Sequence, residues 1–562
     1  MLLPRIHNTP ILLASFGATT AVLLIWWIVL WNGARNGSNP FRMDVSLRPQ
    51  HYLQAITHTS IFVYWAFYWM PIQDAAALIA AQIVFAYAFD IMLSWNSGQT
   101  YTLGFGPFPV IYSTNLFLRF QDNWFFLQFL MVAVGFLAKA FIRWDKDGRR
   151  THIFNPSAFT LALFGVVLIA TRSSDITWGE GIATQLFMPP QIYLFIFLVA
   201  LPGQFLFRVT SMTLPAVLTT YGFSMLYLTL TGTYFFFDSN VPIAVFLGMH
   251  LLFTDPSTSP RTELGRVLFG VIYGLSVVGL YLVLGWIDAP RYYDKLLQVP
   301  LMNLSIRWID RLAESRAISW LSPARIGASL APRLRSLAYV SLWLLAFGAM
   351  SVTNGLGDNH PGHTVTFWEK ACREGRSTGC EKLSVVESRH CNAGSAWACN
   401  ELGILAATKN ISSPPANSSF LHACAAGLRQ ACRNAQTLSA GLRTFLHTDP
   451  DAHDYQIVLR NGKGDLPAMA SLETYTRACD FGWMSGCNEL ARFYFTGDGV
   501  PPDKGRAIRL LEMACNGDHA QACLNVGLMY ERGDGIPRDD TKSQSYLKRA
   551  CDLGDSRACR KR

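Results

Sequence analysis

The sequence predicts an all-α protein built in two parts. The first is a polytopic helical membrane domain with about twelve spans, and the second is an extracytoplasmic α-solenoid that is stapled by disulfide bonds. Three observations predict this: long apolar runs fill the first 355 residues, all twelve cysteines come later, and a 36-residue repeat is present near the C-terminus.

Composition separates the two parts. The chain has 562 residues, of which 51% are hydrophobic and only 15% are charged, whereas soluble domains usually carry nearer a quarter charged residues. The sequence changes near Gly355 to a polar composition. The net charge is +9, but most basic residues lie in short loops between apolar runs, as in membrane proteins, so no nucleic-acid partner is predicted.

About 20 apolar residues are needed to cross a bilayer as a helix. The first run is too long for a signal peptide and lacks a small-residue cleavage site. We therefore predict an extra N-terminal helix and loop in residues 1–50, a membrane domain in 51–310, a basic linker with the last span in 311–355, and a repeat domain in 356–562. The predicted spans are 10–32, 52–71, 75–95, 104–120, 124–142, 157–171, 190–207, 213–231, 241–254, 266–286, 293–309 and 336–354.

Arginine placement orients the spans. The loop from Arg143 to Arg150 and the segment 307–335 are rich in arginine, which favours the cytoplasm. With twelve spans, both termini then lie outside. The cysteine-rich tail would face an oxidising compartment, where disulfides persist. This arrangement predicts a multi-pass protein of a bacterial inner membrane, with the lipid bilayer as one partner and the C-terminal domain in the periplasm.

Two polar loops stand out among the apolar runs. One reads Phe-Asn-Pro-Ser-Ala and contains Asn155, a good helix-capping residue before a proline. The other reads Phe-Thr-Asp-Pro-Ser, where Thr254 and Asp255 can offer oxygens to a neighbouring helix N-terminus. The two loops are expected at the same edge of the membrane domain. Simple helix capping and a shared binding site are both consistent with these residues.

The order and spacing of these loops, followed by Gly-Arg-x-x-Phe-Gly at 265–270, resemble the large RnfD-type membrane protein of Rnf electron-transport complexes. They are also similar to its NqrB-type counterpart in sodium-pumping NADH:quinone oxidoreductase. The resemblance covers roughly residues 50–310. It implies a non-covalently bound flavin near Asn155, Thr254 and Asp255.

The family's usual covalent flavin is not expected. Its attachment motif, an acid followed at set spacing by Ser or Thr and then Thr, is absent from the short outer loop 172–190. The segment 210–213 ends like the motif but has Phe207 in the place of the acid. Haem is also not expected, since nothing places His51, His58, His152 and His250 as facing ligands. No metal site is predicted, and Asp90, inside a span, is expected to pair with Lys139.

The cysteines form six pairs with members eight residues apart, and the last three pairs recur every 36 residues. This period is the signature of stacked helical hairpins. Each pair would bridge the turn between one hairpin and the next, a spacing that fits a disulfide and not a zinc site. The pairs are Cys372 and Cys380, Cys391 and Cys399, Cys424 and Cys432, Cys479 and Cys487, Cys515 and Cys523, and Cys551 and Cys559.

This tail resembles cysteine-rich Sel1-like repeats over residues 367–562. The match is strong over 470–562, and it weakens over 367–470, where an insertion runs through 437–470. The resemblance implies a scaffold that binds other membrane or periplasmic subunits. The leading expectation is a membrane subunit of an oxidoreductase complex, not a stand-alone enzyme. The alternatives are a non-catalytic anchor that presents the solenoid, or an accessory protein for transport or biosynthesis.

Overall fold

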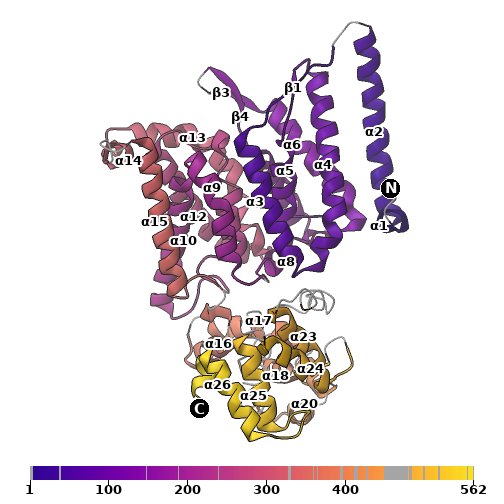
Figure 1. Cartoon of the computed structure of the whole chain (residues 1–562), viewed down its shortest axis with the longest axis vertical. Coiled ribbons are helices and arrows are strands. Elements are labelled where there is room, and N and C mark those ends of the chain that lie inside the picture. Colours follow the sequence, from indigo (N-terminus) through magenta and orange to yellow (C-terminus); the bar gives the residue numbers. More distant parts are fainter. Residues whose placement is uncertain are drawn as a thin grey trace.

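The computed structural model describes residues 4–560 apart from 37–39, 147, 188, 238, 327–330, 358–359, 364, 377, 393–395, 410–414, 426–427, 448–478, 480–483, 498–499, 517–518 and 554. A bundle of long helices, here called the helical half, occupies residues 4–352, and a smaller helical solenoid follows it (Figure 1). The solenoid lies against one end of the helical half. The opposite end carries the strands and is called the distal edge (Figure 1).

The helices of the helical half are α1 (Pro4–Asn8), α2 (Pro10–Arg35), α3 (Pro49–Ala66), α4 (Met70–Asn96), α5 (Pro107–Phe117), α6 (Phe125–Phe141), α7 (Pro156–Ala170), α8 (Gly179–Gln185), α9 (Ile192–Phe207), α10 (Thr210–Thr231), α11 (Ile243–Leu251), α12 (Glu263–Trp286), α13 (Gln298–Glu314), α14 (Pro323–Ile326) and α15 (Pro332–Val352). The short 3-10 helices are η1 (Asp122–Trp124), η2 (Ser174–Ile176), η3 (Pro256–Thr258), η4 (Arg291–Lys295), η5 (Ser319–Leu321) and η6 (Pro361–His363). Proline stands in the first turn of α2, α3, α4, α5, α7 and α15, where its missing N–H costs nothing because first-turn amides have no intrahelical acceptor.

The expectation of an all-α fold needs a small correction, because two short sheets lie at the distal edge. β1 (Met43–Val45) pairs in parallel with β2 (Tyr101–Leu103). β3 (Arg143–Lys146) and β4 (Arg149–His152) form an antiparallel hairpin. The predicted arginine loop is therefore an ordered hairpin, since extended backbone there satisfies its own hydrogen bonds.

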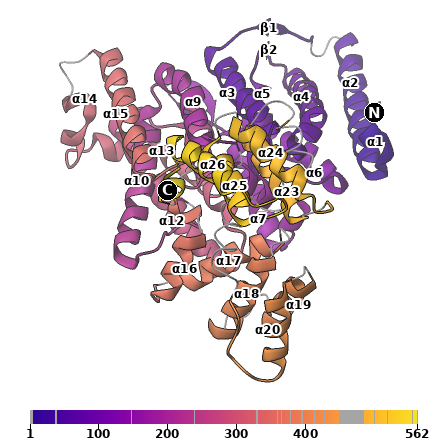
Figure 2. The ribbon, with the colours of Figure 1, turned by 60° about the horizontal axis from the view of Figure 1, so that its bottom comes forward.

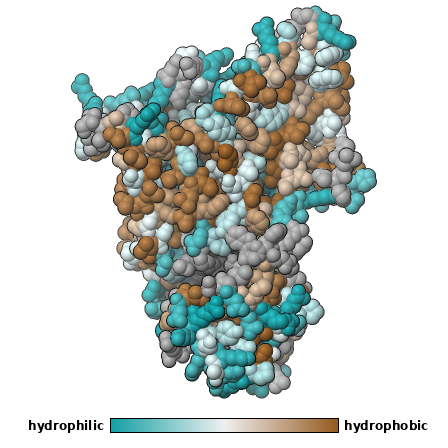
Figure 3. Space-filling model, in the orientation of Figure 1, coloured by the Kyte–Doolittle hydropathy of each residue, from teal (hydrophilic) through white to brown (hydrophobic). Residues whose placement is uncertain are grey.

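Five helices among the described residues are long and apolar enough to cross a membrane: Pro10–Arg35, Pro71–Asn96, Asp122–Phe141, Glu263–Trp286 and Arg333–Val352. Their outward side chains are apolar. Val29 of α2 is 62% exposed and Leu345 of α15 is 71% exposed, which is unfavourable in water and favourable in lipid. Figure 3 shows the resulting hydrophobic surface across the helical half, above a hydrophilic solenoid.

Several predicted spans form shorter helices than expected. The run 104–120 contains α5, only 11 residues long, and the run 241–254 contains α11, only 9 residues long. All nine residues of α11 and eight of the 11 residues of α5 are buried, so both helices pack inside the bundle instead of facing lipid along their length. The run 293–309 begins instead as η4 and continues as α13, which extends to Glu314.

Helices α10 and α12 pack closely through two glycines. A Cβ on Gly274 would lie 2.7 Å from the carbonyl oxygen of Ala216, and one on Gly270 would overlap the carbonyl of Met212. These two glycines are four residues apart and so face the same neighbour. The Gly-Arg-x-x-Phe-Gly stretch thus has a packing role at the point where α12 enters the bundle.

The described solenoid helices are α16 (Val365–Arg373), α17 (Gly379–Asn392), α18 (Ala396–Lys409), α19 (Ala416–Ala425), α20 (Arg429–Ser439), α23 (Met484–Thr496), α24 (Lys504–Asn516), α25 (Ala520–Arg532), α26 (Asp540–Asp552) and α27 (Ser556–Arg560). Figure 2 views the molecule from the solenoid side and separates α18–α20 from α23–α26.

The first solenoid helices dock on the loop between α10 and α11. Arg376 Nη1 donates to the carbonyl oxygen of Gly232 at 2.7 Å. Tyr234 from that loop packs against Trp368 of α16, with ring centroids 6.2 Å apart, and Trp368 is fully buried. The solenoid is therefore held against the helical half by both polar and aromatic contacts.

Candidate functional site

The first polar loop ends in a capped helix. Asn155 Oδ1 accepts hydrogen bonds from the backbone N–H groups of Ser157 and Ala158, so it is the N-cap of α7. Its other amide atom, Nδ2, donates to the carbonyl oxygen of Leu252 at 3.0 Å. The Asn155 side chain therefore caps its own helix and also ties the two polar loops together.

The second polar loop carries its own cap. Asp255 Oδ1 accepts from the N–H of Ser257 at 3.1 Å, and Asp255 Oδ2 lies 3.8 Å from His152 Nε2. Burial alone would raise the pKa of Asp255, but the contacts with His152 and Ser257 outweigh it and lower the pKa to about 2. Asp255 is thus a carboxylate that links the two loops, as Asn155 does from the other side.

A third element, helix α13, is hydrogen-bonded to both loops. Asn303 of α13 accepts from the Asn155 N–H through Oδ1 at 3.2 Å and donates through Nδ2 to the carbonyl oxygen of Thr258 at 3.0 Å. Asn303 is 1% exposed. Because all three side chains are satisfied, the two loops and α13 form one fixed unit.

A cavity of about 480 Å³ opens beside this unit. The first turns of α3, α5 and α7 line it through His51, Pro107 and Ser157, so three positive helix ends face the same space. Its charged lining comprises the cations Arg48, Lys139, Arg143 and Arg150, the histidines His51 and His152, and the carboxylates Asp90 and Asp255.

Positive charge dominates the cavity. Lys139 lies 3.7 Å from Asp90, the expected ion pair, and Asp255 faces His152. Both lining carboxylates therefore already have partners. The arginines remain as the net charge, so the cavity suits an electron-rich or anionic ligand.

The three residues predicted for a binding site have different positions. Asn155 and Asp255 line the cavity, but Thr254 does not, since its hydroxyl donates to the carbonyl oxygen of His250 within the same helix end. Asp255 caps η3, the short helix that directly follows it, which agrees with the helix-capping interpretation of this loop. In the described structure, their role is to position the loops.

Sequence reasoning missed Asn303 and the cavity arginines as site residues. Two of the arginines, Arg143 and Arg150, were already noted in the sequence because they indicate orientation, but only the fold brings Arg48 to the same cavity. No pattern in the sequence indicates that Asn303 is a site residue, because a single polar residue in a partly polar helix is common. His58 and His250 each bond a carbonyl of their own helix, at 2.6 and 2.7 Å.

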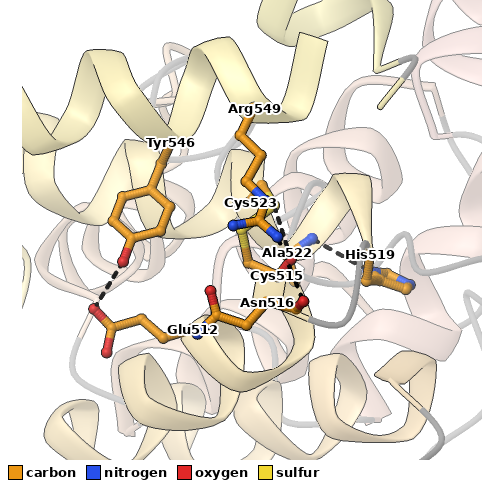
Figure 4. The surroundings of a disulfide bond; sticks show 8 residues. All are labelled: Glu512, Cys515, Asn516, His519, Ala522, Cys523, Tyr546 and Arg549. Carbon is orange, nitrogen blue, oxygen red and sulfur yellow. Dashed lines mark hydrogen bonds between the residues drawn. A yellow bond between two sulfur atoms is a disulfide. The ribbon is translucent and has the colours of Figure 1, made fainter. Parts of the chain in front are cut away.

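In the solenoid, disulfide bonds join the six cysteine pairs that are eight residues apart. Figure 4 shows the bond between Cys515, at the end of α24, and Cys523, in the first turn of α25. His519 caps α25 by accepting from the N–H of Ala522 at 3.2 Å. The disulfide therefore joins α24 to α25, and His519 caps the start of α25.

The inner face of α18 and α20 holds a piece of the same chain. Asn434 accepts from the N–H of Leu446 at 2.7 Å and donates to the Leu446 carbonyl oxygen at 2.8 Å. Asn400 donates to that carbonyl at 3.1 Å, and Glu401 Oε2 lies 2.7 Å from His447 Nδ1. Segment 442–447 is therefore bound through the Leu446 backbone, which any peptide could supply. It is also held through the side chains of His447 and of Phe445, whose ring lies 5.4 Å from that of Phe420.

The same asparagine pair recurs further along the solenoid. Cys-Asn-Glu-Leu stands at both 399–402 and 487–490. Asn525 Nδ2 donates to Asn488 Oδ1 at 3.0 Å, as Asn434 Nδ2 donates to Asn400 Oδ1 at 2.8 Å. The solenoid thus contains two copies of one side-chain arrangement.

The comparison with protein families concerns this part of the chain. The family model described as Sel1 repeat matches residues 485–519 and 520–555. Among curated proteins, none matches the chain. The chain is similar to the crystal structure of a Sel1 repeat protein from Oxalobacter formigenes, with 18% identity, covering 35% of this chain and 85% of that chain at a TM-score of 0.16. It is also similar to c5321, a protective antigen of uropathogenic Escherichia coli that displays an SLR fold, with 12% identity, covering 72% of this chain and 86% of that chain at a TM-score of 0.16.

These findings define the class of protein. The chain is mostly helical, its apolar helices allow membrane association, and it ends in a disulfide-bonded region that indicates an extracytoplasmic location. Within that region, residues 485–555 are two Sel1 repeats. Repeats of this kind generally mediate protein–protein interaction, and we assign that role to this part of the chain.

Proposed function

We propose that the helical half is a membrane subunit of a redox complex and that its distal cavity holds a non-covalently bound flavin. The observation that supports this most is the junction of the two loops through Asn155, Asp255 and Asn303 beside a cavity of about 480 Å³. These are the loops on which the resemblance to the RnfD-type family rests. The volume lies within the usual range for small-molecule sites.

The lining residues fit such a group. A flavin ring offers several hydrogen-bond acceptors, and Arg48, Arg143 and Arg150 are donors on the cavity wall. Thr151 also lines it, and its buried hydroxyl has no hydrogen-bond partner, so a ligand atom could satisfy it. A bound flavin would supply electron transfer, while the arginines would orient its ring and favour its electron-rich form.

The test is the visible spectrum of the purified full chain. A flavin absorbance that denaturation releases supports the proposal, and Arg48→Gln should weaken flavin binding about tenfold or more, because a charge-assisted contact is lost. Arg35→Gln, at the end of α2 and outside this cavity, is the matched control. A colourless protein that takes up no added flavin would overturn the proposal, and a flavin adduct on a threonine would overturn its non-covalent form.

A second candidate function is a non-catalytic anchor whose solenoid captures extended segments of other membrane or periplasmic proteins. Its support is segment 442–447, which is bound by Asn400 and Asn434 through the backbone of Leu446. A partner segment of similar extended form would make the same hydrogen bonds.

A displacement experiment tests this candidate. Leu446→Pro removes the N–H that Asn434 accepts, and it should free the groove for a labelled peptide with the sequence of residues 441–447. Fluorescence anisotropy should then detect binding to the Leu446→Pro chain. Adding Asn434→Ala should abolish this binding. Equal binding with and without Asn434 would contradict backbone recognition by this asparagine.

A further inference from the structure

A second cavity of about 210 Å³ lies at the distal edge, away from the first. It sits where α9 ends and α10 begins, and the first turns of α12 and α15 close its other side. Its polar lining is formed by Arg208, Thr210, Ser211, Arg261, Glu263, Arg266, Arg335, Ser336 and Tyr339.

The charge of this cavity is strongly positive. Four arginines line it, against the single carboxylate of Glu263. Glu263 Oε1 lies 3.0 Å from Arg335 Nη2, so one arginine is already neutralised. Arg266 donates only to carbonyl oxygens, those of Pro260 at 3.0 Å and Arg208 at 3.3 Å. Arg208 and Arg266 form no ion pair among the described residues, although the carboxylates of Glu263 and Asp310 act electrostatically on Arg266. The cavity lining therefore keeps a net positive charge.

An unsatisfied hydroxyl lines the same cavity. Thr210 is 2% exposed, and its Oγ1 has no hydrogen-bond partner. Thr210 is also the first residue of α10, a helix of 22 residues, where backbone N–H groups lack intrahelical acceptors and the helix end is positive. The Tyr339 hydroxyl from α15 is likewise buried without a partner. Two donors, a helix N-terminus and the arginines thus lie around one small space.

We propose that this cavity binds the phosphate of an anionic phospholipid. A phosphate offers several acceptor oxygens and negative charge, which match helix N-termini and arginine forks. The lipid source follows from the surroundings. Leu206 lines the cavity and is 57% exposed, and Leu337, next to Ser336, is 50% exposed. Acyl chains would cover these apolar side chains.

Such a lipid would join two elements. Arg208 and Thr210 belong to the α9–α10 corner, whereas Ser336 and Tyr339 belong to α15. Helix α15 leads directly to the solenoid. A phosphate between them would hold α15 against the bundle, so anionic lipid should stabilise the whole chain and not only its surface.

Thermal unfolding of the full chain in lipid nanodiscs tests this proposal. Phosphatidylglycerol should raise the melting temperature, and phosphatidylcholine of the same acyl composition should not. Arg208→Gln and Thr210→Val should each weaken the apparent affinity for phosphatidylglycerol, Arg208→Gln by about tenfold, which corresponds to about 1.4 kcal/mol. Arg311→Gln is the matched control, since Arg311 is an exposed arginine of α13 that does not line the cavity.

The outcomes separate the alternatives. Each variant must first melt like the unchanged chain without anionic lipid, which shows that it folds. An identical response of Arg208→Gln and Arg311→Gln would overturn the site. If inorganic phosphate alone produces the full stabilisation of the detergent-solubilised chain, the phosphate site stands and its lipid source is overturned. Retained flavin binding in Arg208→Gln would keep this result distinct from the first cavity.

Discussion

At the residue scale, four buried asparagines hold backbone segments in place through hydrogen bonds. Asn155, Asn303, Asn400 and Asn434 are all nearly or fully buried and hydrogen-bonded. An amide side chain carries both a donor and an acceptor, so it can bind a backbone N–H and a carbonyl oxygen at once. Asn155 and Asn303 join backbone segments that are far apart in the sequence, whereas Asn400 and Asn434 both bind the backbone of Leu446.

Two substitutions at Asn155 separate its two roles. Asn155→Ser keeps a capping hydroxyl but is too short to reach Leu252, so it should cost about 1 kcal/mol of unfolding free energy, the value of one hydrogen bond. Asn155→Ala loses the cap as well and should cost about 1 kcal/mol more. Denaturant unfolding in detergent measures both. Equal stability of the two variants would contradict a capping role.

The pair between His447 and Glu401 should make segment 442–447 sensitive to pH. The hydrogen bond that His447 donates to the Glu401 carboxylate raises the pKa of His447. Burial opposes this effect, and the negative charges of Glu401 and Glu369 add to it. Protonated His447 thus stabilises the bound segment fully below the ordinary histidine pKa, and this contribution is lost as pH rises through the raised value.

Trypsin cleavage at Arg443 measures how often segment 442–447 leaves its binding site on the solenoid. Cleavage should be slower at pH 5.5 than at pH 8.5, after correction for the protease's own pH dependence with a peptide of the same sequence. His447→Gln should remove most of the difference. If the corrected cleavage rates are equal at both pH values, the pair between His447 and Glu401 does not hold this segment in place.

At the scale of elements, each disulfide bond is local and joins cysteines eight residues apart. α17 contributes Cys380 to one bond and Cys391 to the next, so this helix is tethered at both ends. Each bond closes a ring of only nine residues. The sequence predicted these local pairings because the spacing recurred, whereas a framework of distant bonds has no such regular spacing.

Loss of one bond should have a modest, local effect. Replacing Cys515 and Cys523 together by serine should lower the unfolding free energy of the solenoid by about 2.6 kcal/mol in the chain-entropy model. Tryptic mapping without reduction should show the other linked pairs unchanged. A bond between the 372–432 and 479–559 groups would contradict the stacked-hairpin arrangement.

The sequence predicted the long elements better than the short ones. Helices such as α12 follow directly from an unbroken apolar run. The early end of α5 at Phe117 does not, since Leu118 is as apolar as its neighbours and becomes extended through tertiary contacts. For the 480 Å³ cavity, the sequence predicted only that two polar loops meet. Its walls come from α3 and α5, whose first turns are brought there by the fold.

At the scale of the whole molecule, orientation in the bilayer is the central prediction. The distal edge carries both cavities and most loop arginines, so we expect it in the cytoplasm and residues 356–562 in the periplasm. Single cysteines engineered into a chain with its native disulfides should react with an impermeant reagent in residues 442–446 of the solenoid. They should not react in segment 310–335 of intact spheroplasts, and reaction there would reverse the arrangement.

Helix α11 connects the region of the first cavity with the region that contacts the solenoid. It is only 9 residues long, about 13 Å of helix. One end continues into Leu252, whose carbonyl oxygen accepts a hydrogen bond from Asn155 beside the 480 Å³ cavity. The other end follows the loop whose Gly232 binds Arg376 of the solenoid. If a ligand in the cavity changes the solenoid's affinity for a partner by some factor, thermodynamic linkage requires that partner to change the ligand's affinity by the same factor. Helix α11 would then couple the two sites across the bilayer in both directions.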